Sequence, residues 1–216
     1  MPSIVEPRHL DYLDSLKAAP DALIREMENY AAERGVPILD RRAAELLETL
    51  VRAARPVRLL EIGTAIGYSA VRMARAAGEN AVVETIELSD EMIAQAERNF
   101  ERSGAHERIR LHKGDAREIL PALEGAFDLI FLDADKEDYE TYFDLALEKL
   151  RAGGTLVVDN LLWHGYAAPG AEIPEKYHES TEHIRRFNRA FLDSPALDAT
   201  ILTVGDGVGV GVKRAT

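Results

Sequence analysis

The chain has 216 residues, which suits one large domain or one domain with an appendage. It contains no cysteine, which excludes disulfide bonds, thiolate metal sites and cysteine nucleophiles, and it has no apolar run long enough to span a membrane. The formal net charge of −12 disfavours long non-specific contacts with nucleic acid, which depend on basic patches, but it is compatible with a small, local nucleic-acid substrate.

The first part of the chain predicts helices. Its opening twenty residues mix acids with apolar side chains and lack the apolar core of a signal peptide, so we expect a soluble cytoplasmic protein. Apolar residues at helical spacing predict a helix over 20–35 and another over 40–56, the second with Asp40 as its N-cap. Residues 1–56 are therefore expected to form a helical extension before a core over 57–216.

From residue 57 onward, short apolar runs alternate with helical segments. The predicted strands cover 57–63, 81–88, 109–115, 127–134 and 155–160, with helical segments at 67–78, 89–104, 116–123 and 138–154 between them. This alternation predicts an α/β fold with a mostly parallel sheet and helices on both faces. Gly205-Asp206-Gly207 separates two β-prone runs and predicts a closing hairpin, so the sheet should end in an antiparallel strand.

Ligands of such sheets bind outside the carboxyl ends of the strands. The first strand end carries Gly63 and Gly67, which allow a ligand close to the backbone, although their spacing differs from the dinucleotide fingerprint. Glu87 ends the second strand, where a carboxylate can accept both hydroxyls of a ribose. Together they favour an adenosine-type cofactor over a tight turn and a solvated strand end. Asp115 follows the third strand and either accepts from adenine or caps the next helix.

Acidic and amide side chains follow the fourth and fifth predicted strands. Asp133 comes after one, and Asp159 and Asn160 come after the other. Neighbouring parallel strands lie about 5 Å apart, so the three side chains can converge. Oxygen donors alone suit a hard cation such as Mg²⁺, Mn²⁺ or Ca²⁺, whereas the alternative is a pair of unrelated caps or turns. Lys136 is either a general base activated by that cation or a solvated loop lysine.

These motifs form a set with a known pattern. The stretches "EIGTAIGYSA", "IEL", "GDA", "FLDADKEDY", "GGTLVVDNLLWHG" and "VGDGV" resemble those of the cation-dependent class I O-methyltransferases of the caffeoyl-CoA and catechol type. The resemblance runs from about residue 36 to the C-terminus. "VPIL" and the N-terminal layout look closest to a bacterial subgroup that includes the tRNA 5-hydroxyuridine methyltransferase.

The resemblance implies a Rossmann-like, seven-stranded sheet with a reversed last strand, S-adenosylmethionine as cofactor and a homodimer. It further implies that the N-terminal extension covers cofactor or substrate and makes dimer contacts. The cofactor-binding residues implied by motif position are Leu39, Glu61, Gly63, Tyr68, Ser69, Glu87, Asp115, Ala116 and Asp133. The implied metal ligands are Asp133, Asp159 and Asn160, and the implied catalytic residues are Lys136 and Asp133.

The expected reaction is attack of a substrate oxygen on the sulfonium methyl group, with the cation bound to two neighbouring substrate oxygens. A catechol or caffeoyl-type small molecule offers such a pair, and so does 5-hydroxyuridine in tRNA. The mixed charge of residues 167–191 speaks against tRNA. A non-catalytic module that only binds the cofactor is a third reading, and the complete set of acidic, amide and lysine residues argues against it.

Aromatic residues after the fifth strand are candidates for the substrate wall: Trp163, His164, Tyr166 and Tyr177. Trp163 could equally serve the core or a dimer contact, and His164 could be a solvated loop residue. Further on, His183 and the pair Arg185-Arg186 are expected on the solvated face of a helix whose Ile184, Phe187 and Phe191 face inward.

Overall fold

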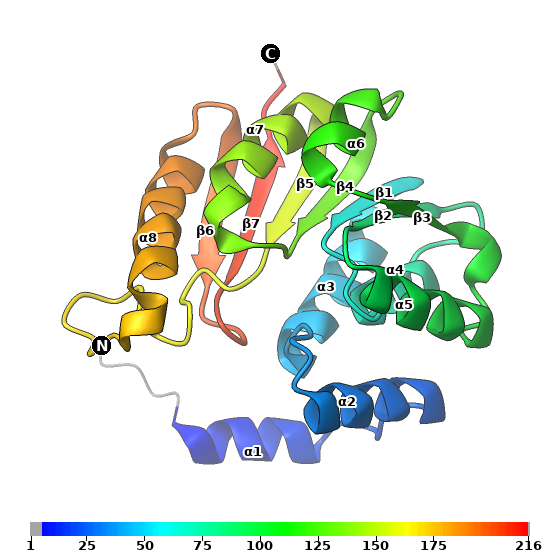
Figure 1. The fold of residues 1–216 in the computed structure, drawn as a ribbon, viewed down its shortest axis with the longest axis horizontal. Helices are drawn as coiled ribbons and strands as arrows, with labels where there is room; N and C mark the ends of the chain where they lie inside the picture. Colours follow the sequence, from blue (N-terminus) through cyan, green and yellow to red (C-terminus); the bar gives the residue numbers. More distant parts are fainter. Residues whose placement is uncertain (1–5, 216) are drawn as a thin grey trace.

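Seven strands form one sheet in the computed structural model, which describes residues 6–215 (Figure 1). The strand order is β3-β2-β1-β4-β5-β7-β6. Strands β1 to β5 run parallel, and β7 pairs antiparallel with both β5 and β6. The predicted mostly parallel sheet with a reversed last strand is confirmed. The strands are β1 Arg58–Ile62, β2 Val82–Glu87, β3 Ile109–Lys113, β4 Phe127–Leu132, β5 Leu150–Val158, β6 Leu197–Leu202 and β7 Val208–Lys213.

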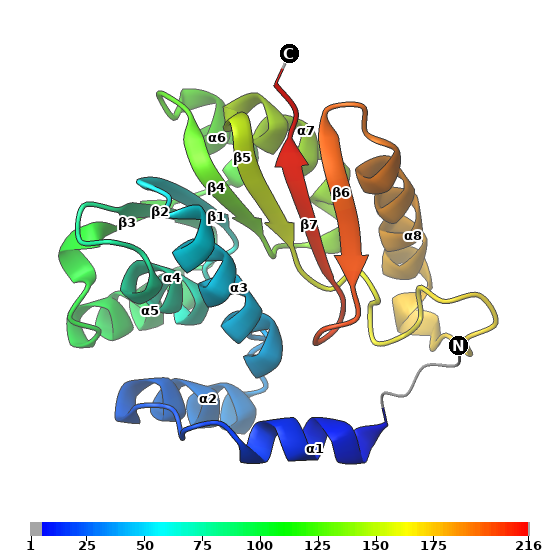
Figure 2. The ribbon, with the colours of Figure 1, turned by 180° about the vertical axis from the view of Figure 1, so that it is seen from behind.

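Helices cover both faces of the sheet. They are α1 Pro7–Ser15, α2 Ala22–Arg34, α3 Arg41–Ala54, α4 Tyr68–Ala76, α5 Asp90–Arg102, α6 Ala116–Ala122, α7 Tyr139–Lys149 and α8 His178–Asp193, with 3₁₀ turns at His106–Arg108, Lys136–Asp138 and Glu175–Tyr177. One apolar core forms between the sheet and α2 to α5, and a second between the sheet and α6 to α8 (Figures 1 and 2). Alternate residues of each buried strand enter opposite cores, as the pleat of a strand requires.

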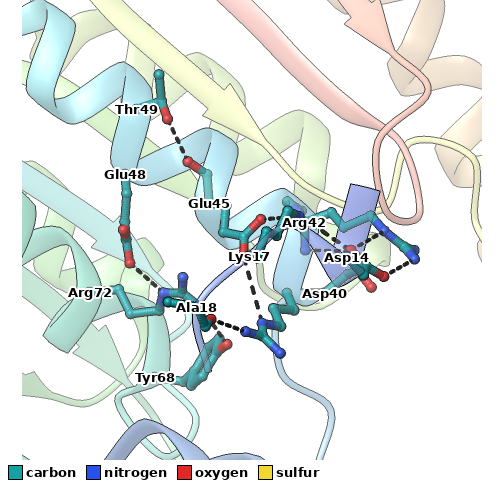
Figure 3. Close-up of polar contacts among 12 residues, drawn as sticks. Asp14, Lys17, Ala18, Asp40, Arg42, Glu45, Glu48, Thr49, Tyr68 and Arg72 are labelled. Atoms are coloured by element: carbon teal, nitrogen blue, oxygen red, sulfur yellow. Dashed lines mark hydrogen bonds and ion pairs between the residues drawn. The ribbon is translucent and has the colours of Figure 1, made fainter. Parts of the chain in front are cut away.

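The N-terminal helices differ in how they attach to the core. Leu47 and Val51 of α3 are fully buried in the first core. Asp40 caps α3, as predicted, by accepting from the backbone N–H groups of Arg42 and Ala43. None of the nine residues of α1 is buried. Ion pairs join α1 and the residues after it to α3 instead: Asp14 of α1 contacts Arg42, and Lys17, two residues after α1 ends, contacts Glu45 (Figure 3). The extension 1–56 thus combines a core helix with a peripheral one.

Two local predictions are wrong. Residues 150–154 were expected in a helical segment, but β5 begins at Leu150, which pairs with Phe127 before a register shift. Pairing with a neighbouring strand overrides the helical pattern there. Arg185 was expected to be solvated, yet its guanidinium donates to the carbonyl oxygens of Tyr166 and Ala167. It therefore holds the loop after β5. The inward-facing side of α8 is confirmed, because Ile184, Phe187 and Phe191 are buried.

Within residues 6–215, no helix is both long enough and apolar enough to cross a membrane.

Candidate active site

One cavity of about 930 Å³ opens at the carboxyl ends of β1, β2, β3, β4 and β5. This is the size range of small-molecule sites. Most of the site residues expected from the sequence contribute to its wall: Leu39, Gly63, Tyr68, Ser69, Glu87, Asp115, Ala116, Asp133, Lys136, Asp159, Asn160, Trp163, His164 and Tyr177. Glu61 and Tyr166 lie one layer behind the wall, against Ser69 and Tyr177 respectively. The individual roles given to these residues stay predictions.

The turn after β1 brings two strand ends into contact. Gly63 has a φ of +96°, and a Cβ atom there would lie 2.0 Å from the carbonyl oxygen of Asp133. A side chain is therefore impossible without moving β1 from β4. Gly67 caps α4 with a φ of +83° and faces the ring of Phe100, where a Cβ atom would also clash. Both glycines are therefore needed for packing at this turn.

Glu61 is fully buried beneath this turn. Its carboxylate accepts from the hydroxyls of Ser69 and Thr85, and Thr85 also meets the hydroxyl of Thr64. Burial raises the pKa of Glu61 to about 8, since two hydroxyl donors only partly replace lost water. Glu61 thus supports the cavity wall through Ser69. The sequence gives no sign of the partner Thr85.

The carboxylates at the ends of β2 and β3 are held by local hydrogen bonds. Glu87 accepts from the backbone N–H groups of Ala65 and Ser89, each at 2.8 Å, which fixes its direction. Asp115 accepts from the backbone N–H of Arg117 at 2.8 Å and caps α6. The Arg117 guanidinium also pairs with Asp115 and lowers the pKa of that carboxyl. The helix-cap alternative for Asp115 is therefore confirmed, and a contact with adenine stays a prediction.

Asp133, Asp159 and Asn160 lie together where β4 and β5 end. The backbone N–H of Asp133 donates to the carbonyl of Ile62 at 3.0 Å, and that of Asp159 donates to Leu132 at 3.1 Å, so both ends are fixed. Asp159 is 2% exposed, and its Oδ1 has no hydrogen-bond partner among the described residues. Burial, and then the nearby Asp133 carboxylate, raise the pKa of Asp159 above its ordinary value.

This arrangement fits a hard cation. A buried carboxylate oxygen without a partner is unfavourable, and a cation would remove both that penalty and the repulsion between the two acids. Carboxylate and amide oxygens are the donors that Mg²⁺, Mn²⁺ and Ca²⁺ prefer. In the described part of the chain, no three His or acidic residues cluster at metal-binding spacing. The third donor would have to be the amide of Asn160.

Lys136 is nearly buried beside this group, so it is not a solvated loop lysine. Its Nζ donates to Asp133 Oδ1 at 3.1 Å, to the Ala134 carbonyl at 2.8 Å and to the Tyr139 hydroxyl at 2.8 Å. Tyr139 is fully buried, and its hydroxyl donates to the backbone carbonyl of Asp159 at 3.2 Å. Sequence reasoning missed Tyr139. Its position three residues after Lys136, at the start of a helix, could have indicated the contact.

Aromatic rings form the wall opposite the strand ends. The rings of Trp163, His164 and Tyr166 lie 5.9, 5.4 and 5.4 Å from the ring of Tyr177. The indole N–H of Trp163 donates to the Ser180 hydroxyl at 2.9 Å, which anchors the wall to α8. The loop residues predicted for the substrate wall thus form one cluster, three of whose members face the cavity.

The opposite side of the cavity is joined to the N-terminal helices. The Tyr68 hydroxyl donates to Glu28 of α2 at 2.8 Å and accepts from Arg72 at 2.5 Å. Arg72 in turn donates to Glu48 of α3 at 2.6 Å (Figure 3). Tyr68 was predicted as a site residue, but this network behind it was not.

Comparison with known proteins finds similarity to O-methyltransferases. A family model described as O-methyltransferase matches residues 17–214. A catechol O-methyltransferase from Niastella koreensis is 35% identical over 94% of this chain and 90% of its own length, and one from Mycobacterium tuberculosis is 36% identical over 76% of each chain. An O-methyltransferase from Bacillus cereus, solved in complex with SAH, has a TM-score of 0.83 and 28% identity, covering 94% of this chain and 96% of its own.

Proposed function

The chain belongs to the O-methyltransferase family, and we propose that it methylates one hydroxyl of a catechol-like small molecule, with S-adenosylmethionine as methyl donor and a divalent cation in the site. The observation that carries the proposal is the Asp133–Asp159 pair. Asp159 Oδ1, which is buried and has no hydrogen-bond partner among residues 6–215, belongs to a residue that lines one cavity with Lys136 and with the strand ends at Gly63 and Glu87.

Several features support S-adenosylmethionine as the donor. The bound product in the Bacillus cereus relative is SAH, and this chain has the same fold. Gly63 and Ser69 line the cavity at the first strand end, and the fixed Glu87 carboxylate lies at the second, where it can accept ribose hydroxyls. When bound, the cofactor supplies a methyl group already activated on a sulfonium. The protein therefore has to orient the acceptor oxygen and exclude water.

The acidic side of the cavity supports the cation. Asp133, Asp159 and Asn160 would hold it, and it would lower the pKa of a bound hydroxyl and fix the direction of that oxygen. Lys136 is the residue we assign to the substrate proton. Its Nζ lies 3.1 Å from Asp133 Oδ1 and is held by Tyr139, so as an ammonium it can stabilise the oxyanion, and as a neutral amine it can accept that proton.

The cavity lining favours a neutral aromatic substrate. Seven Asp or Glu residues line it, against three Lys or Arg residues. Trp163 and Tyr177 offer ring faces on which a planar substrate can stack. A catechol has two neighbouring oxygens for the cation and one ring for this wall. The wobble uridine of tRNA offers the same oxygens but brings a polyanion, which this lining disfavours.

An activity panel with and without chelator tests the proposal. We expect purified protein to methylate catechols with labelled S-adenosylmethionine, to lose activity in EDTA and to regain it with Mg²⁺ or Mn²⁺. Asp159→Ala should reduce turnover by at least about 10–100-fold, the loss usual when even a group that only orients a metal ligand is removed, while SAH binding measured by calorimetry persists.

The matched control is Asp144→Ala, the same change at an exposed position of α7, which should leave turnover unchanged. Unchanged turnover in Asp159→Ala would contradict the cation mechanism. Activity on undermodified tRNA and not on catechols would contradict the substrate class.

A further inference from the structure

The turn between β6 and β7 contacts the loop that carries the third candidate cation ligand. Asp206 Oδ1 accepts from the backbone N–H of His164 at 2.7 Å, and its Oδ2 accepts from Asn160 Nδ2 at 3.4 Å. The backbone carbonyl of Asp206 accepts from the N–H of Leu162 at 2.8 Å. One residue thus binds the beginning, middle and end of the segment Asn160–His164.

That segment has an unfavourable backbone. Asn160, Trp163 and His164 have φ angles of +60°, +48° and +56°, the left-handed region that residues other than glycine rarely adopt. Such conformations persist only where the surroundings enforce them. The three hydrogen bonds to Asp206 are positioned to do so. They act on a loop that supplies a cation ligand at one end and aromatic wall residues at the other.

The contact also decides which end of the Asn160 amide faces the cavity. A carboxylate only accepts hydrogen bonds, so the amide must turn its Nδ2 toward Asp206. Its Oδ1, the only end able to bind a cation, is then directed away from Asp206. An unrestrained asparagine could present either end.

The turn itself is held firmly. A Cβ atom on Gly207 would lie 2.7 Å from the backbone nitrogen of Leu162, and one on Gly205 would lie 3.0 Å from Cβ of Asp40, at the start of α3. The carbonyl of Gly207 accepts from the N–H of Leu161 at 2.9 Å. Asp206 is therefore presented from a packed turn and not from a free loop.

We propose that Asp206 is a positioning residue: it orients the Asn160 amide for the cation and fixes the course of the loop through Trp163 and His164. The proposal rests on the proposed function in so far as Asn160 is a cation ligand. It adds that one carboxylate, which is neither a cation ligand nor part of the substrate wall, controls the cation affinity and the shape of that wall.

The test is Mn²⁺ affinity, measured by electron paramagnetic resonance on the full chain without substrate or cofactor. Asp206→Ala should weaken Mn²⁺ binding by about 10–100-fold, the usual effect of losing a group that orients a metal ligand. It should also raise KM for a catechol, because Trp163 and His164 lose their restraint. SAH affinity should not change. Asp198→Ala removes an exposed carboxylate from neighbouring β6 and should change none of these values.

A double-mutant cycle separates positioning from general damage to the fold. Asn160→Asp replaces the amide by a carboxylate with two equivalent oxygens, which needs no orientation. In that background, Asp206→Ala should no longer weaken Mn²⁺ binding, because the carboxylate at position 160 needs no partner to orient it. Equal losses in both backgrounds would overturn the proposal, as would wild-type Mn²⁺ affinity in Asp206→Ala.

If the unmodified protein itself binds no Mn²⁺, the proposed function fails and the role of Asp206 fails with it. If the unmodified protein binds Mn²⁺ and Asp206→Ala binds it equally well, only the role of Asp206 fails.

Discussion

The Glu61 carboxyl holds a proton in the folded chain under conditions where an unfolded chain would release it. Burial raises its pKa from an ordinary 4.5 to about 8, and its hydrogen-bond donors are the Ser69 and Thr85 hydroxyls. Between these two values the folded state binds more protons than the unfolded state. The free energy of unfolding contributed by this group therefore decreases as pH rises through that window.

We expect the ligand-free protein to be less stable at about pH 8.5 than at about pH 5.5, and Glu61→Gln to flatten this decline. The variant cannot ionise, so its melting temperature should exceed the wild-type value on the alkaline side by a few degrees, at roughly 2–4 °C per kcal/mol for a chain of this size. Thermal denaturation followed by circular dichroism across the window measures both slopes.

Asp159, whose pKa is also raised by burial, adds to the decline in both proteins, so the difference between their slopes still reports on Glu61. Carboxyls with a lowered pKa act outside this window. Asp115, beside Arg117, loses its contribution only when pH falls below its ordinary value of 3.8. Identical slopes for wild type and Glu61→Gln would show that Glu61 is ionised in the fold and would refute the prediction.

The sequence predicts which residues lie at the strand ends, but it does not predict their hydrogen-bond partners. Asp133 and Asp159 follow apolar runs, and the rule that parallel strands present ligands at their carboxyl ends brings them together. Asp206 is 46 positions from Asn160, and its motif indicated only a hairpin. A contact of that kind depends on where β7 lies beside β5, which hydrophobic periodicity does not encode.

At the scale of elements, substitutions in α1 and α3 test how much each helix of the N-terminal extension contributes to the stability of the fold. Leu47 of α3 is 1% exposed within the first core, whereas Leu13 of α1 is 51% exposed. The same truncation at both sites therefore separates a core helix from a helix held by surface ion pairs. Such pairs contribute little to stability in water.

Leu47→Ala should lower the free energy of unfolding by about 2–5 kcal/mol, because it removes buried methyl groups and leaves a cavity. Leu13→Ala should change it by less than about 0.5 kcal/mol, as is usual for surface positions. Urea denaturation of both variants gives the two values under one condition. A comparable loss in the two would mean that α1 is packed as tightly as α3.

Element prediction succeeded where sequence pattern and tertiary pairing agree. The apolar runs of β1, β2 and β4 are mostly buried on both faces, β3 is partly exposed at the edge of the sheet, and all four strands appear close to their expected bounds. The start of β5 was misplaced, because residues 150–154 continue the spacing of α7 until Leu150 pairs with Phe127. Arg185 was misplaced for a similar reason: its partners are loop carbonyls with no regular pattern.

At the scale of the whole molecule, charge should influence which substrates reach the cavity. The chain carries a formal net charge of −12, and acids outnumber Lys and Arg by seven to three in the cavity lining. A bound divalent cation and a sulfonium would offset part of the local excess but little of the total. A negative electrostatic potential at long range slows the approach of anions and leaves neutral molecules unaffected.

We therefore expect kcat/KM for a neutral catechol to vary by less than about twofold between low and physiological ionic strength. For a caffeoyl thioester of coenzyme A, which carries phosphates, kcat/KM should rise several-fold over the same range, because salt screens the repulsion within about 8–10 Å. Initial rates at fixed Mg²⁺ activity, with ionic strength set by KCl, measure both slopes. A thioester that reacts fastest at low salt would instead indicate attraction, and so a cationic entry that outweighs the acidity of the chain.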